Sequence, residues 1–552
     1  MTDLNINLDE NCPMCGKPGT MNGGPCMSCM SKQIKKDVQD RVIQESAGIT
    51  AVDDKNIIDS QFITKCLFDN TVGDGRLYAT VLRNKFIFCK NTGEWFEWNG
   101  NYWERDIMNR SLAAVEIIVP HYLQEFKTTA KELTDLIAGG EDPKSEKAKK
   151  LEKMRDKLIS RVNQLRDDKR RTACLKFAHT IDNPLAIKGD ELDTNPWLFP
   201  CANGIIDLRT GKIKPGCPKD YLSLASPIEF KGIDEPAPIW ERSLMEIFNG
   251  NRDLVDYLQR LFGYGMTGIV NEKIFPVFYG KTGWNGRSLI VETIAHIMGD
   301  LSGAIQSEMM MSQKYGKSSA GPSPDIMALK GVRLAFASEV DENQRFSAAR
   351  IKWLTGNDTL VGRGLQEKYQ TKFTPTHKLI LMTNTQPAAP AKDKAFWERM
   401  HLIPFEVSFV KRDPIEPHER RANLNLGNEI KEEYSGILAW LVRGCLLWQQ
   451  QGINPPLAVI EASNKYRQNE DMMGDFIEEC CIKEPAAKVQ ASVIYQTFME
   501  WYHANIGKGD KLTGSWFGKQ FNHYFEKTKI NGCNYYLGVD VKSGAGYQET
   551  II

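Results

Sequence analysis

The sequence predicts a multidomain α/β protein whose core domain is built around a phosphate-binding loop. The chain has 552 residues, which is enough for several domains that each bury a hydrophobic core. An apolar, strand-like segment runs into a glycine-rich loop and then an apolar-patterned helix over residues 274–299. Two further apolar segments with strand character follow, and each ends in polar residues. Strands and helices in this order are typical of a sheet covered by helices.

Composition places the chain among folded proteins. Hydrophobic residues make up 41% of the sequence and charged residues 25%, which is ordinary globular composition. No stretch approaches the roughly 20 uncharged apolar residues of a membrane span, and the N-terminus lacks the apolar core of a signal peptide. Lys and Arg together number 70, as do Asp and Glu, so local basic surfaces would have to hold any polyanion. We expect a cytoplasmic protein with no membrane partner.

Shifts in composition divide the chain into six predicted segments. A cysteine cluster comes first, and a polar, mixed-charge linker follows it. An aromatic and helical region precedes the phosphate-binding core, and a helical connector and a small terminal domain follow the core. The predicted boundaries are 1–32 for a four-cysteine ribbon, 33–65 for the linker, 66–235 for an α+β domain, 236–410 for the P-loop core, 411–470 for the helical connector and 471–552 for a winged-helix-like domain.

Four cysteines near the N-terminus predict a zinc ribbon. Cys12, Cys15, Cys26 and Cys29 form two C-x2-C pairs separated by ten residues, which is the spacing of a structural site with four sulfur ligands for Zn²⁺. Zinc would also supply folding free energy that so short a segment cannot obtain from a core. Disulfides or a redox pair are the alternatives, but the odd total of 13 cysteines and the lack of a secretion signal argue against them.

The predicted α+β region combines aromatic hairpins with a basic helix. Alternating aromatic residues between Phe86 and Trp103, with asparagine- and glycine-containing turns, predict small hairpins. Their side chains either stack on nucleic-acid bases or form a compact β core. Residues 141–171 carry 12 basic and 7 acidic side chains, which either follow a phosphate backbone or form a solvated helix face. We favour the β core and the solvated face.

The C-terminal segment predicts a small domain of two helices and a hairpin. Helices are expected over residues 493–505 and 516–527, and the strand-like sequence NYYLGVDV follows them. This order suggests a winged helix, with Lys519, Lys527 and Lys529 available for phosphate groups.

The glycine-rich loop carries the strongest functional signal. Backbone N–H groups of such a loop and of the following helix bind phosphates, and the Ser288 hydroxyl is placed to ligate magnesium. The standard pattern is G-x4-G-K-[ST], whereas here five residues separate Gly280 from Gly286 and Arg287 replaces the lysine. A guanidinium keeps the charge but is planar and forked, and Lys281 is an alternative source of an ammonium group. The predicted nucleotide-binding residues of the loop are Gly280, Lys281, Thr282, Gly283, Trp284, Asn285, Gly286, Arg287 and Ser288.

Polar residues after the next two strands complete a candidate catalytic set. Glu339 ends an apolar run, where it can polarise the attacking water, and Asp341 can hold magnesium through water. Asn384 ends a third apolar strand, where it can orient water against the terminal phosphate. Arg399 follows on a predicted helix and is a candidate for reaching the nucleotide of a neighbouring subunit. Each feature alone is commonplace, but their order behind a phosphate loop predicts a nucleotide-binding P-loop domain.

Several long blocks of the sequence resemble the phage and plasmid primase-helicases, the poxvirus-like branch of the superfamily III helicases. The resemblance runs from about Cys66 to the C-terminus and rests on GEWFEWNGNYWERD, NGIIDLRTG, GKTGWNGRS and the run from KGVRLAFASEVDE to FWERMHLIPFE. It implies a helicase-associated domain over 66–235, followed by an AAA+ core that assembles into a hexameric ring. Such a ring would translocate on single-stranded DNA during replication of a phage, prophage or mobile element in a bacterial or phage-infected host cell.

The resemblance also carries over to single residues. Glu339 matches the acid of the second family motif with Asp341 as its partner, Asn384 looks like the sensor, and Arg399 looks like the arginine finger. The family commonly has two consecutive arginines, whereas this chain has Glu398-Arg399. A block between the second and third motifs resembles the helix and hairpin that place basic residues in the central channel. Its candidate DNA-binding residues are Lys352, Arg363, Lys368 and Lys372.

These observations leave three functions open. The first is an ATP-dependent replicative DNA helicase that uses ATP, Mg²⁺ and Zn²⁺ and acts on single-stranded and forked DNA as a homo-oligomeric ring. The chain has no Asp-x-Asp, the metal-binding motif typical of a primase centre, so a primase domain is not expected. A primase or other replication proteins are therefore further candidate partners. The alternative is a ring that binds nucleotide and DNA but hydrolyses weakly or not at all, acting as an initiator or assembly platform. The third is a DNA-binding regulator that uses the ribbon and the winged helix.

Overall fold

The computed structural model describes residues 10–11, 18–20, 58–313, 321–338, 344–365, 370–391, 393–505 and 512–542. Near the N-terminus, β1 (Glu10–Asn11) pairs antiparallel with β2 (Pro18–Thr20). The four cysteines of the predicted zinc ribbon lie outside the described residues, so the ribbon stays a prediction. The chain divides into two compact units, Met1–Arg83 with Arg110–Leu185, and Asn84–Asn109 with Ala186–Ile552. The segment predicted as one α+β domain therefore contributes to both units.

Apart from β1 and β2, the described elements of the first unit are helical. Its first helix begins inside the segment predicted as a linker, because the Asp59 carboxylate caps it by accepting a hydrogen bond of 2.7 Å from Phe62 N. The helix expected within the basic stretch 141–171 is confirmed as α6, with Leu158 and Val162 buried on one face. The elements of this unit are α2 (Ser60–Phe68), α3 (Asn70–Val81), α4 (Arg110–Ala113), η1 (Ala114–Ile118), α5 (Val119–Ala138), α6 (Glu146–Gln164) and α7 (Asp168–Ala178).

A buried carboxylate joins four of these helices. Asp74 of α3 has an exposed fraction of 0%. It accepts hydrogen bonds from Arg161 Nη1 at 2.7 Å, from Arg170 Nε at 2.8 Å and from Tyr122 OH at 2.8 Å. Because these donors come from α6, α7 and α5, the paired charges hold the helices in one arrangement.

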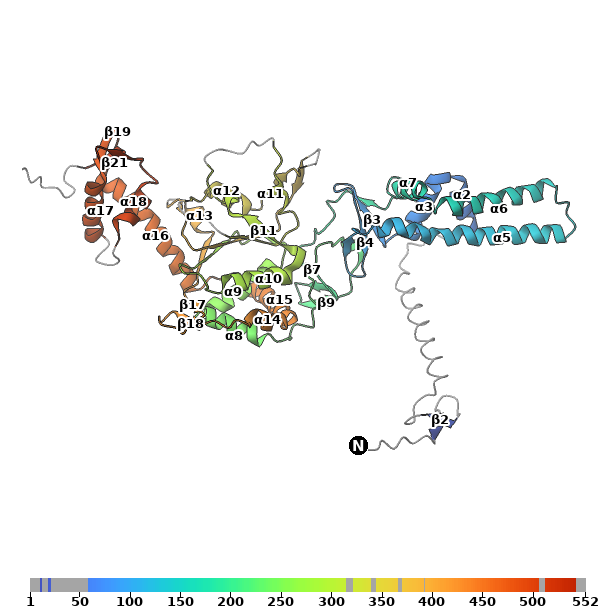
Figure 1. Cartoon of the computed structure of the whole chain (residues 1–552), viewed down its shortest axis with the longest axis horizontal. Coiled ribbons are helices and arrows are strands. Elements are labelled where there is room, and N and C mark those ends of the chain that lie inside the picture. The colour runs from blue at the N-terminus through green and yellow to red at the C-terminus, as the bar shows by residue number, and fades with distance from the viewer. Residues whose placement is uncertain are drawn as a thin grey trace, which may run out of the picture. The chain divides into compact units, whose positions relative to one another are not determined.

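A five-stranded parallel sheet forms the core of the second unit, in the order β11-β12-β15-β10-β16. Helices cover both of its faces (Figure 1). The strands are β10 (Phe275–Tyr279), β11 (Ser302–Gln306), β12 (Leu334–Ser338), β15 (Lys378–Thr383) and β16 (Met400–Pro404). The helices of this region are α8 (Pro238–Ile247), α9 (Arg252–Gly265), α10 (Arg287–Met298), η3 (Gly299–Leu301), η4 (Ser307–Met309), α11 (Pro324–Met327), α12 (Ala348–Leu354), α13 (Lys394–Trp397), α14 (Leu426–Lys431) and α15 (Tyr434–Gln451).

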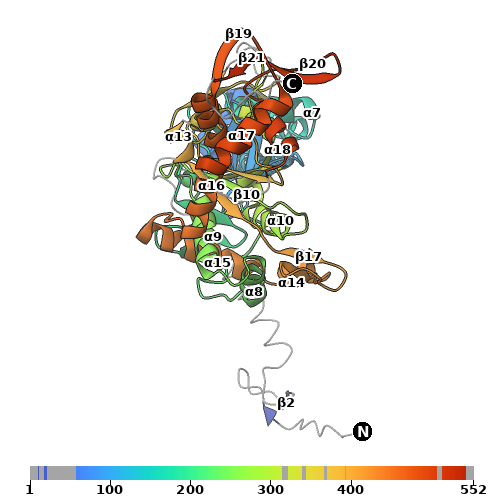
Figure 2. The ribbon, with the colours of Figure 1, turned by 90° about the vertical axis from the view of Figure 1, so that its left-hand side faces the viewer.

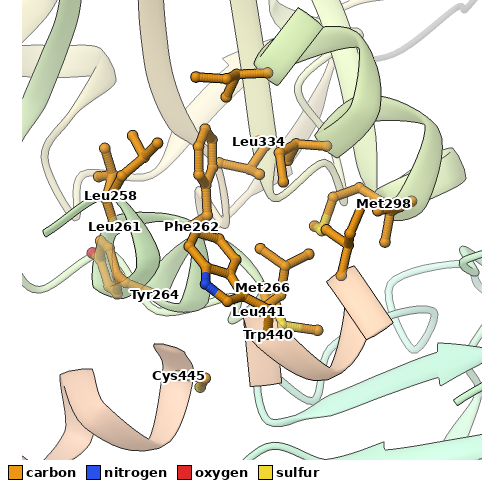
Figure 3. Close-up of a cluster of buried hydrophobic side chains, with 14 of the residues drawn as sticks. Leu258, Leu261, Phe262, Tyr264, Met266, Met298, Leu334, Trp440, Leu441 and Cys445 are labelled. Carbon is orange, nitrogen blue, oxygen red and sulfur yellow. The ribbon is translucent and has the colours of Figure 1, made fainter. Parts of the chain in front are cut away.

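Side chains of the strands alternate between two hydrophobic clusters, as the pleat of a buried parallel strand requires. Leu334 and Phe336 of β12 join the larger cluster with α8, α9, α10 and α15, whereas Ala335 and Ala337 face α11, α12 and α13. Figure 3 shows the larger cluster, in which side chains of α9 pack against Trp440 and Leu441 of α15.

Two buried cations lie at the amino ends of neighbouring strands and hold the C-terminal end of α9. Arg333 Nη1, just before β12, donates to Met266 O at 2.6 Å, and Lys378 Nζ of β15 donates to Thr267 O. Burial lowers the pKa of Arg333 to about 10 and also lowers the pKa of Lys378. Positive charge suits the carbonyl end of a helix, so these residues anchor α9 at the sheet edge opposite the carboxyl ends of the strands.

Smaller sheets complete the second unit. The predicted aromatic hairpins are confirmed, and Phe96 and Trp103 are buried in one hydrophobic cluster, which supports the β-core interpretation. The block NGIIDLRTGKI forms β8 and β9, which pair antiparallel. These elements are β3 (Phe86–Cys89), β4 (Glu94–Trp98), β5 (Trp103–Arg105), β6 (Ala186–Ile187), β7 (Leu198–Cys201), β8 (Gly204–Asp207), β9 (Lys212–Lys214), η2 (Pro218–Asp220), β13 (Leu360–Gly362), β14 (Thr371–Phe373), β17 (Ser408–Val410) and β18 (Glu419–Arg421).

One long helix leads into the C-terminal region. It crosses the predicted boundary at 470/471 without interruption. Figure 2 shows α17 and α18 beside the strands β19, β20 and β21. An aromatic cluster around Phe476, Phe498 and Phe521 fills the space between these helices and strands. The second predicted helix ends at Phe521 rather than at Lys527, which instead pairs with Tyr536 in a hairpin. The elements are α16 (Leu457–Cys480), β19 (Cys481–Gln490), α17 (Ala491–Asn505), α18 (Gly514–Phe521), β20 (Lys527–Ile530) and β21 (Cys533–Val541).

Candidate functional site

The glycine-rich loop lies at the carboxyl end of the parallel sheet, between β10 and α10. Tyr279, the last residue of β10, is in register with Thr383, the last residue of β15. The next residue, Gly280, donates its N–H to Thr383 O at 3.3 Å. The loop therefore leaves the sheet directly beside Asn384. Ligands of parallel α/β sheets characteristically bind at this edge.

The turn into α10 is built around Gly286. Gly286 precedes the helix with φ of +83°, a left-handed conformation that favours glycine. A side chain there would also lie 2.6 Å from Ile247. No side chain caps the first turn of α10 in the described part of the chain, so its N–H groups stay open to the loop. Ser288, in this first turn, is exposed.

Arg287 is turned into the protein rather than toward the outer side of the loop. It is 8% exposed, and burial lowers its pKa. Its Nε donates to Asn285 Oδ1 at 2.9 Å, and its Nη1 donates to Phe278 O at 3.2 Å and to Thr383 O. Its Nη2 donates to Asn384 Oδ1. A guanidinium of this shape spans two neighbouring strand ends, which a single ammonium group cannot do.

Asn285 ties the inner side of the loop together. Its side chain is 3% exposed, and it donates from Nδ2 to Thr282 O at 2.8 Å while accepting from Arg287. Gly280 packs so closely that a Cβ atom there would lie 1.9 Å from Asn285 Nδ2. The sequence placed Asn285 in the loop but contained no signal for this inward role.

The outer side of the loop is held by β17, a contact that the sequence analysis missed. Ser408 Oγ donates to Gly283 O at 3.2 Å, and Phe409 N donates to Trp284 O at 2.7 Å. Trp284 is 72% exposed, and the ammonium of Lys411 lies 5.2 Å from the centre of its ring. No motif could reveal these partners, because they lie more than 120 residues away from the loop in the sequence. Lys281 and Thr282 are exposed.

The predicted acidic residues follow β12, which pairs with β15 on the side away from β10. The strand ends at Ser338, in register with Met382 of β15. Glu339 and Asp341 themselves lie outside the described residues, so their catalytic roles stay predictions.

Arg399 lies near the amino ends of the strands, whereas the glycine-rich loop of the same chain lies at their carboxyl ends. The Arg399 carbonyl accepts from Phe275 N at 2.6 Å, at the amino end of β10, whereas the loop follows the carboxyl end of that strand. A strand of this length spans about 13 Å between its first and last residues. The Arg399 side chain donates from Nη1 to Ala395 O at 2.7 Å. The structure therefore brings Asn384 to the loop within one chain but keeps Arg399 away from it.

The candidate DNA-binding residues lie on α12 and on the β13–β14 hairpin. Lys352 of α12 forms an ion pair of 2.7 Å with Asp393, and this hydrogen bond lowers the Asp393 pKa. Arg363 follows β13, and Lys372 of β14 is exposed and in register with Val361. Lys368 lies outside the described residues.

Within the described ranges, no group of three or more His, Cys, Asp or Glu residues is arranged to hold a metal ion. The same part of the chain contains no helix that is both long and apolar enough to cross a membrane. These findings leave the predicted zinc site untested.

Comparison with known proteins gives one family match and several distant relatives. Residues 75–249 match the family described as D5 N terminal like. "Putative helicase L207/L206" of Acanthamoeba polyphaga mimivirus is 25% identical over 447 residues, which cover 77% of this chain and 45% of the relative. "Putative helicase 022R" of Frog virus 3 is 24% identical over 390 residues, which cover 58% and 40%. "Putative helicase 121R" of Invertebrate iridescent virus 3 is 22% identical over 504 residues, which cover 82% and 52%.

The chain spans about half the length of these viral relatives. Among solved structures, the apo structure of the NrS-1 C-terminal region aligns with 84% of this chain and 98% of its own, at 12% identity and a TM-score of 0.42. The D5 N-terminal-like match and the viral relatives named as helicases together support a relationship between this chain and the primase-helicase family.

Proposed function

We propose that the chain is an ATP-dependent replicative DNA helicase of a phage, prophage or mobile element, acting as an AAA+ ring of superfamily III type on single-stranded and forked DNA. The observation that carries this proposal is the position of the loop. Residues 280–288 follow the strand β10, Asn384 follows the neighbouring strand β15, and both meet at the carboxyl edge of one parallel sheet. The helicase names of the relatives agree with this site.

In the proposed mechanism, backbone N–H groups of the loop and of the first turn of α10 bind the phosphates of ATP. Magnesium, when bound, neutralises charge on the phosphate oxygens, and Ser288 and Asp341 are the residues that would hold it. Glu339 activates the attacking water, and Asn384 aligns that water against the terminal phosphate. Lys281 is an exposed ammonium at the start of the loop and adds to the positive potential there.

Arg399 would complete the site of the next subunit. Because it lies at the sheet edge opposite its own loop, it can serve a nucleotide only in another copy of the chain. A homo-oligomeric ring, which we propose is hexameric, supplies such a copy at every interface. An arginine delivered in this way stabilises transition-state charge.

DNA would be bound by the β13–β14 hairpin, with Lys372 on β14 and with Arg363 and Lys368 in the sequence between the two strands. Cations that lie close together on one hairpin can neutralise successive phosphates of single-stranded DNA. The C-terminal helices and hairpin are a proposed winged-helix-like domain with Lys519, Lys527 and Lys529 as further DNA contacts.

A second candidate function is a ring that binds nucleotide and DNA but hydrolyses ATP poorly, as an initiator or assembly platform. The specific observation in its favour is Arg287, which replaces the loop lysine and directs its guanidinium to four protein acceptors. If a mobile ammonium at this position is indispensable for hydrolysis, this protein binds ATP without turning it over.

DNA-stimulated ATP hydrolysis by the zinc-replete full chain separates the two candidates. We expect hydrolysis by the native protein, stimulated by single-stranded DNA, and its loss in Glu339→Gln. Glu292→Gln, a change at an exposed acid of α10, is the matched control and should keep native activity. A native protein that binds ATP yet hydrolyses it only after Arg287→Lys would instead identify the platform. A protein without affinity for adenine nucleotides would overturn both.

A further inference from the structure

The guanidinium of Arg287 is bonded directly to the side-chain amide of Asn384. Nη2 of Arg287 donates to Asn384 Oδ1, while Nε and Nη1 donate to Asn285 Oδ1, Phe278 O and Thr383 O. The acceptors come from the end of β10, from the loop and from the end of β15. The planar fork therefore connects the phosphate loop to the neighbouring strand in a fixed geometry.

This contact determines which way the Asn384 amide faces. A guanidinium has only hydrogen-bond donors, so the amide atom that faces it must be the carbonyl oxygen. The NH₂ group of Asn384 is then directed away from Arg287. Asn384 is exposed, and no hydrogen bond from its Nδ2 to another described residue is present. The side chain thus presents a hydrogen-bond donor, and not an acceptor, at the edge of the sheet beside the loop.

The charge of Arg287 reinforces that donor. All four of its acceptors are neutral carbonyl oxygens of backbone or side-chain amides. A buried cation bonded to an amide oxygen polarises the amide and makes its N–H groups stronger donors. Four of the five guanidinium N–H groups are thus used within the protein, which leaves the second N–H of Nη2.

We propose that Arg287 is a positioning residue that orients and polarises Asn384, so that Asn384 donates a hydrogen bond from Nδ2 to the terminal phosphate of the bound nucleotide. This inference rests on the proposed ATP-binding function. It assigns Arg287 a role different from that of the lysine it replaces, because its charge acts on the phosphate through the asparagine amide. It also makes Asn384 a phosphate donor instead of an acceptor that orients the attacking water.

A double-mutant cycle tests the first half of the proposal. Arg287→Lys, Asn384→Ala and the double variant are compared with the native full chain in kcat and KM for ATP in the presence of single-stranded DNA. We expect each single change to lower kcat about tenfold or more with KM changed less than about threefold. The double variant should be no slower than Asn384→Ala, because residues that act as a unit are not additive.

Two results would overturn this half. One is a double variant whose loss is the product of the two single losses, which would mean independent roles. The other is an Arg287→Lys variant that binds ATP about tenfold more weakly or that hydrolyses it faster than the native protein, either of which makes position 287 a direct phosphate ligand. Thermal unfolding and binding of a fluorescent ATP analogue show that each variant is folded.

Asn384→Asp tests the orientation of the amide. Aspartate keeps an oxygen acceptor but has no N–H to donate, and it adds negative charge beside the phosphates. We expect kcat to fall about a hundredfold or more. Activity within about threefold of native would show that Asn384 acts as an acceptor for water and would refute the proposal. Asn163→Asp, at an exposed asparagine of α6, controls for the added charge.

The same experiments distinguish this inference from the function on which it rests. A native chain that hydrolyses ATP, together with an additive cycle, would refute the positioning role and leave the helicase proposal standing. A native chain with no affinity for ATP would refute both.

Discussion

Gly280 shows how little room single residues of the loop have. Gly280 packs directly against the Asn285 side chain, and Asn285 in turn accepts a hydrogen bond from Arg287. A side chain at residue 280 would displace this inner layer of the loop, whereas Gly283, on the exposed outer side, has no atom within 4 Å of the position of an added Cβ. Glycines of one loop therefore serve different physical purposes.

Gly280→Ala should weaken binding of a fluorescent ATP analogue about tenfold or more and destabilise the protein by about 1–3 kcal/mol, since overpacking moves Asn285 and Arg287 together. Thermal unfolding beside Gly283→Ala gives the matched comparison, because that change should leave stability unaltered. Equal stability of the two variants would contradict the packing described for the loop.

Glu470 is a residue whose charge depends on pH near neutrality. It is buried on α16, it accepts from Ala389 N at 2.8 Å, and burial raises its pKa to about 7 despite the nearby Arg345 guanidinium. In the unfolded chain its pKa is about 4.3. The folded state therefore binds more protons between these two values, and its stability falls as pH rises through this window.

Glu470→Gln should remove this pH dependence, because the amide oxygen still accepts from Ala389 N but carries no charge. We expect the variant and the native protein to be similar in stability at pH 5. At pH 8 the variant should be more stable by about 1–3 kcal/mol, as measured by urea unfolding. A native protein that gains stability over the variant between pH 5 and 8 would contradict the assigned burial.

At the scale of elements, α16 connects the sheet to the C-terminal region. One face of its first half binds the segment after Arg399 and the segment after Asn384. Ser463 Oγ accepts from Leu402 N at 2.9 Å, Tyr466 OH donates to Pro387 O, and Glu470 accepts from Ala389 N. Its second half, from Met472 to Cys480, joins the aromatic C-terminal cluster. The segment after Asn384 therefore contacts α16, and the second half of this helix is part of the C-terminal domain. A shift of that segment would act directly on α16.

Tyr466→Phe should destabilise the protein by about 1–2 kcal/mol, because the buried Pro387 carbonyl loses its donor. Since Pro387 lies three residues after Asn384, DNA-stimulated ATP turnover should also fall several-fold. Tyr495→Phe removes a comparable hydroxyl contact, to Leu512 O at 2.8 Å, inside the C-terminal domain. It serves as the control and should leave turnover unchanged. Equal effects of the two changes on turnover would argue against a link through α16.

Most elements of the core could be predicted because their sequence patterns are local. The apolar runs of β10, β12 and β15 and the glycine loop before α10 carry their own signals. Predictions failed where tertiary pairing decides the outcome: residue 527 looked helical but pairs with Tyr536 in β20–β21. The division of residues 66–235 between two units was likewise hidden, because it depends on β6 pairing with β3 about 100 residues earlier.

The features of the candidate site also divide into those with a local sequence signal and those that depend on tertiary contacts. The positions of Gly286, Arg287 and Asn384 were readable from motif spacing, but the inward turn of Arg287 was not, since it depends on the carbonyl groups of two neighbouring strands. Ser408 and Lys411 carried no signal, because only the fold brings β17 to the loop.

At the scale of the whole molecule, the placement of Arg399 makes a second copy of the chain part of the proposed site. A mixture of two inactive variants tests this. Arg399→Ala keeps an intact loop, and Glu339→Gln keeps an intact arginine. In equimolar mixed rings, about one interface in four combines the two intact halves, so ATP hydrolysis should recover to about a quarter of the native rate.

Each variant alone serves as the control for the mixture and should be inactive. No recovery, with mixed oligomers verified by differently tagged subunits, would contradict an arginine acting between subunits.

The most direct test of the central claim is photo-crosslinking of the zinc-replete full chain with an azido derivative of ATP and Mg²⁺, followed by peptide mapping. We expect the label on the peptide containing residues 280–288, and we expect excess unmodified ATP to prevent the labelling. Labelling that ATP does not compete away, or that falls on peptides remote from this loop, would contradict a nucleotide site at the junction of β10 and α10.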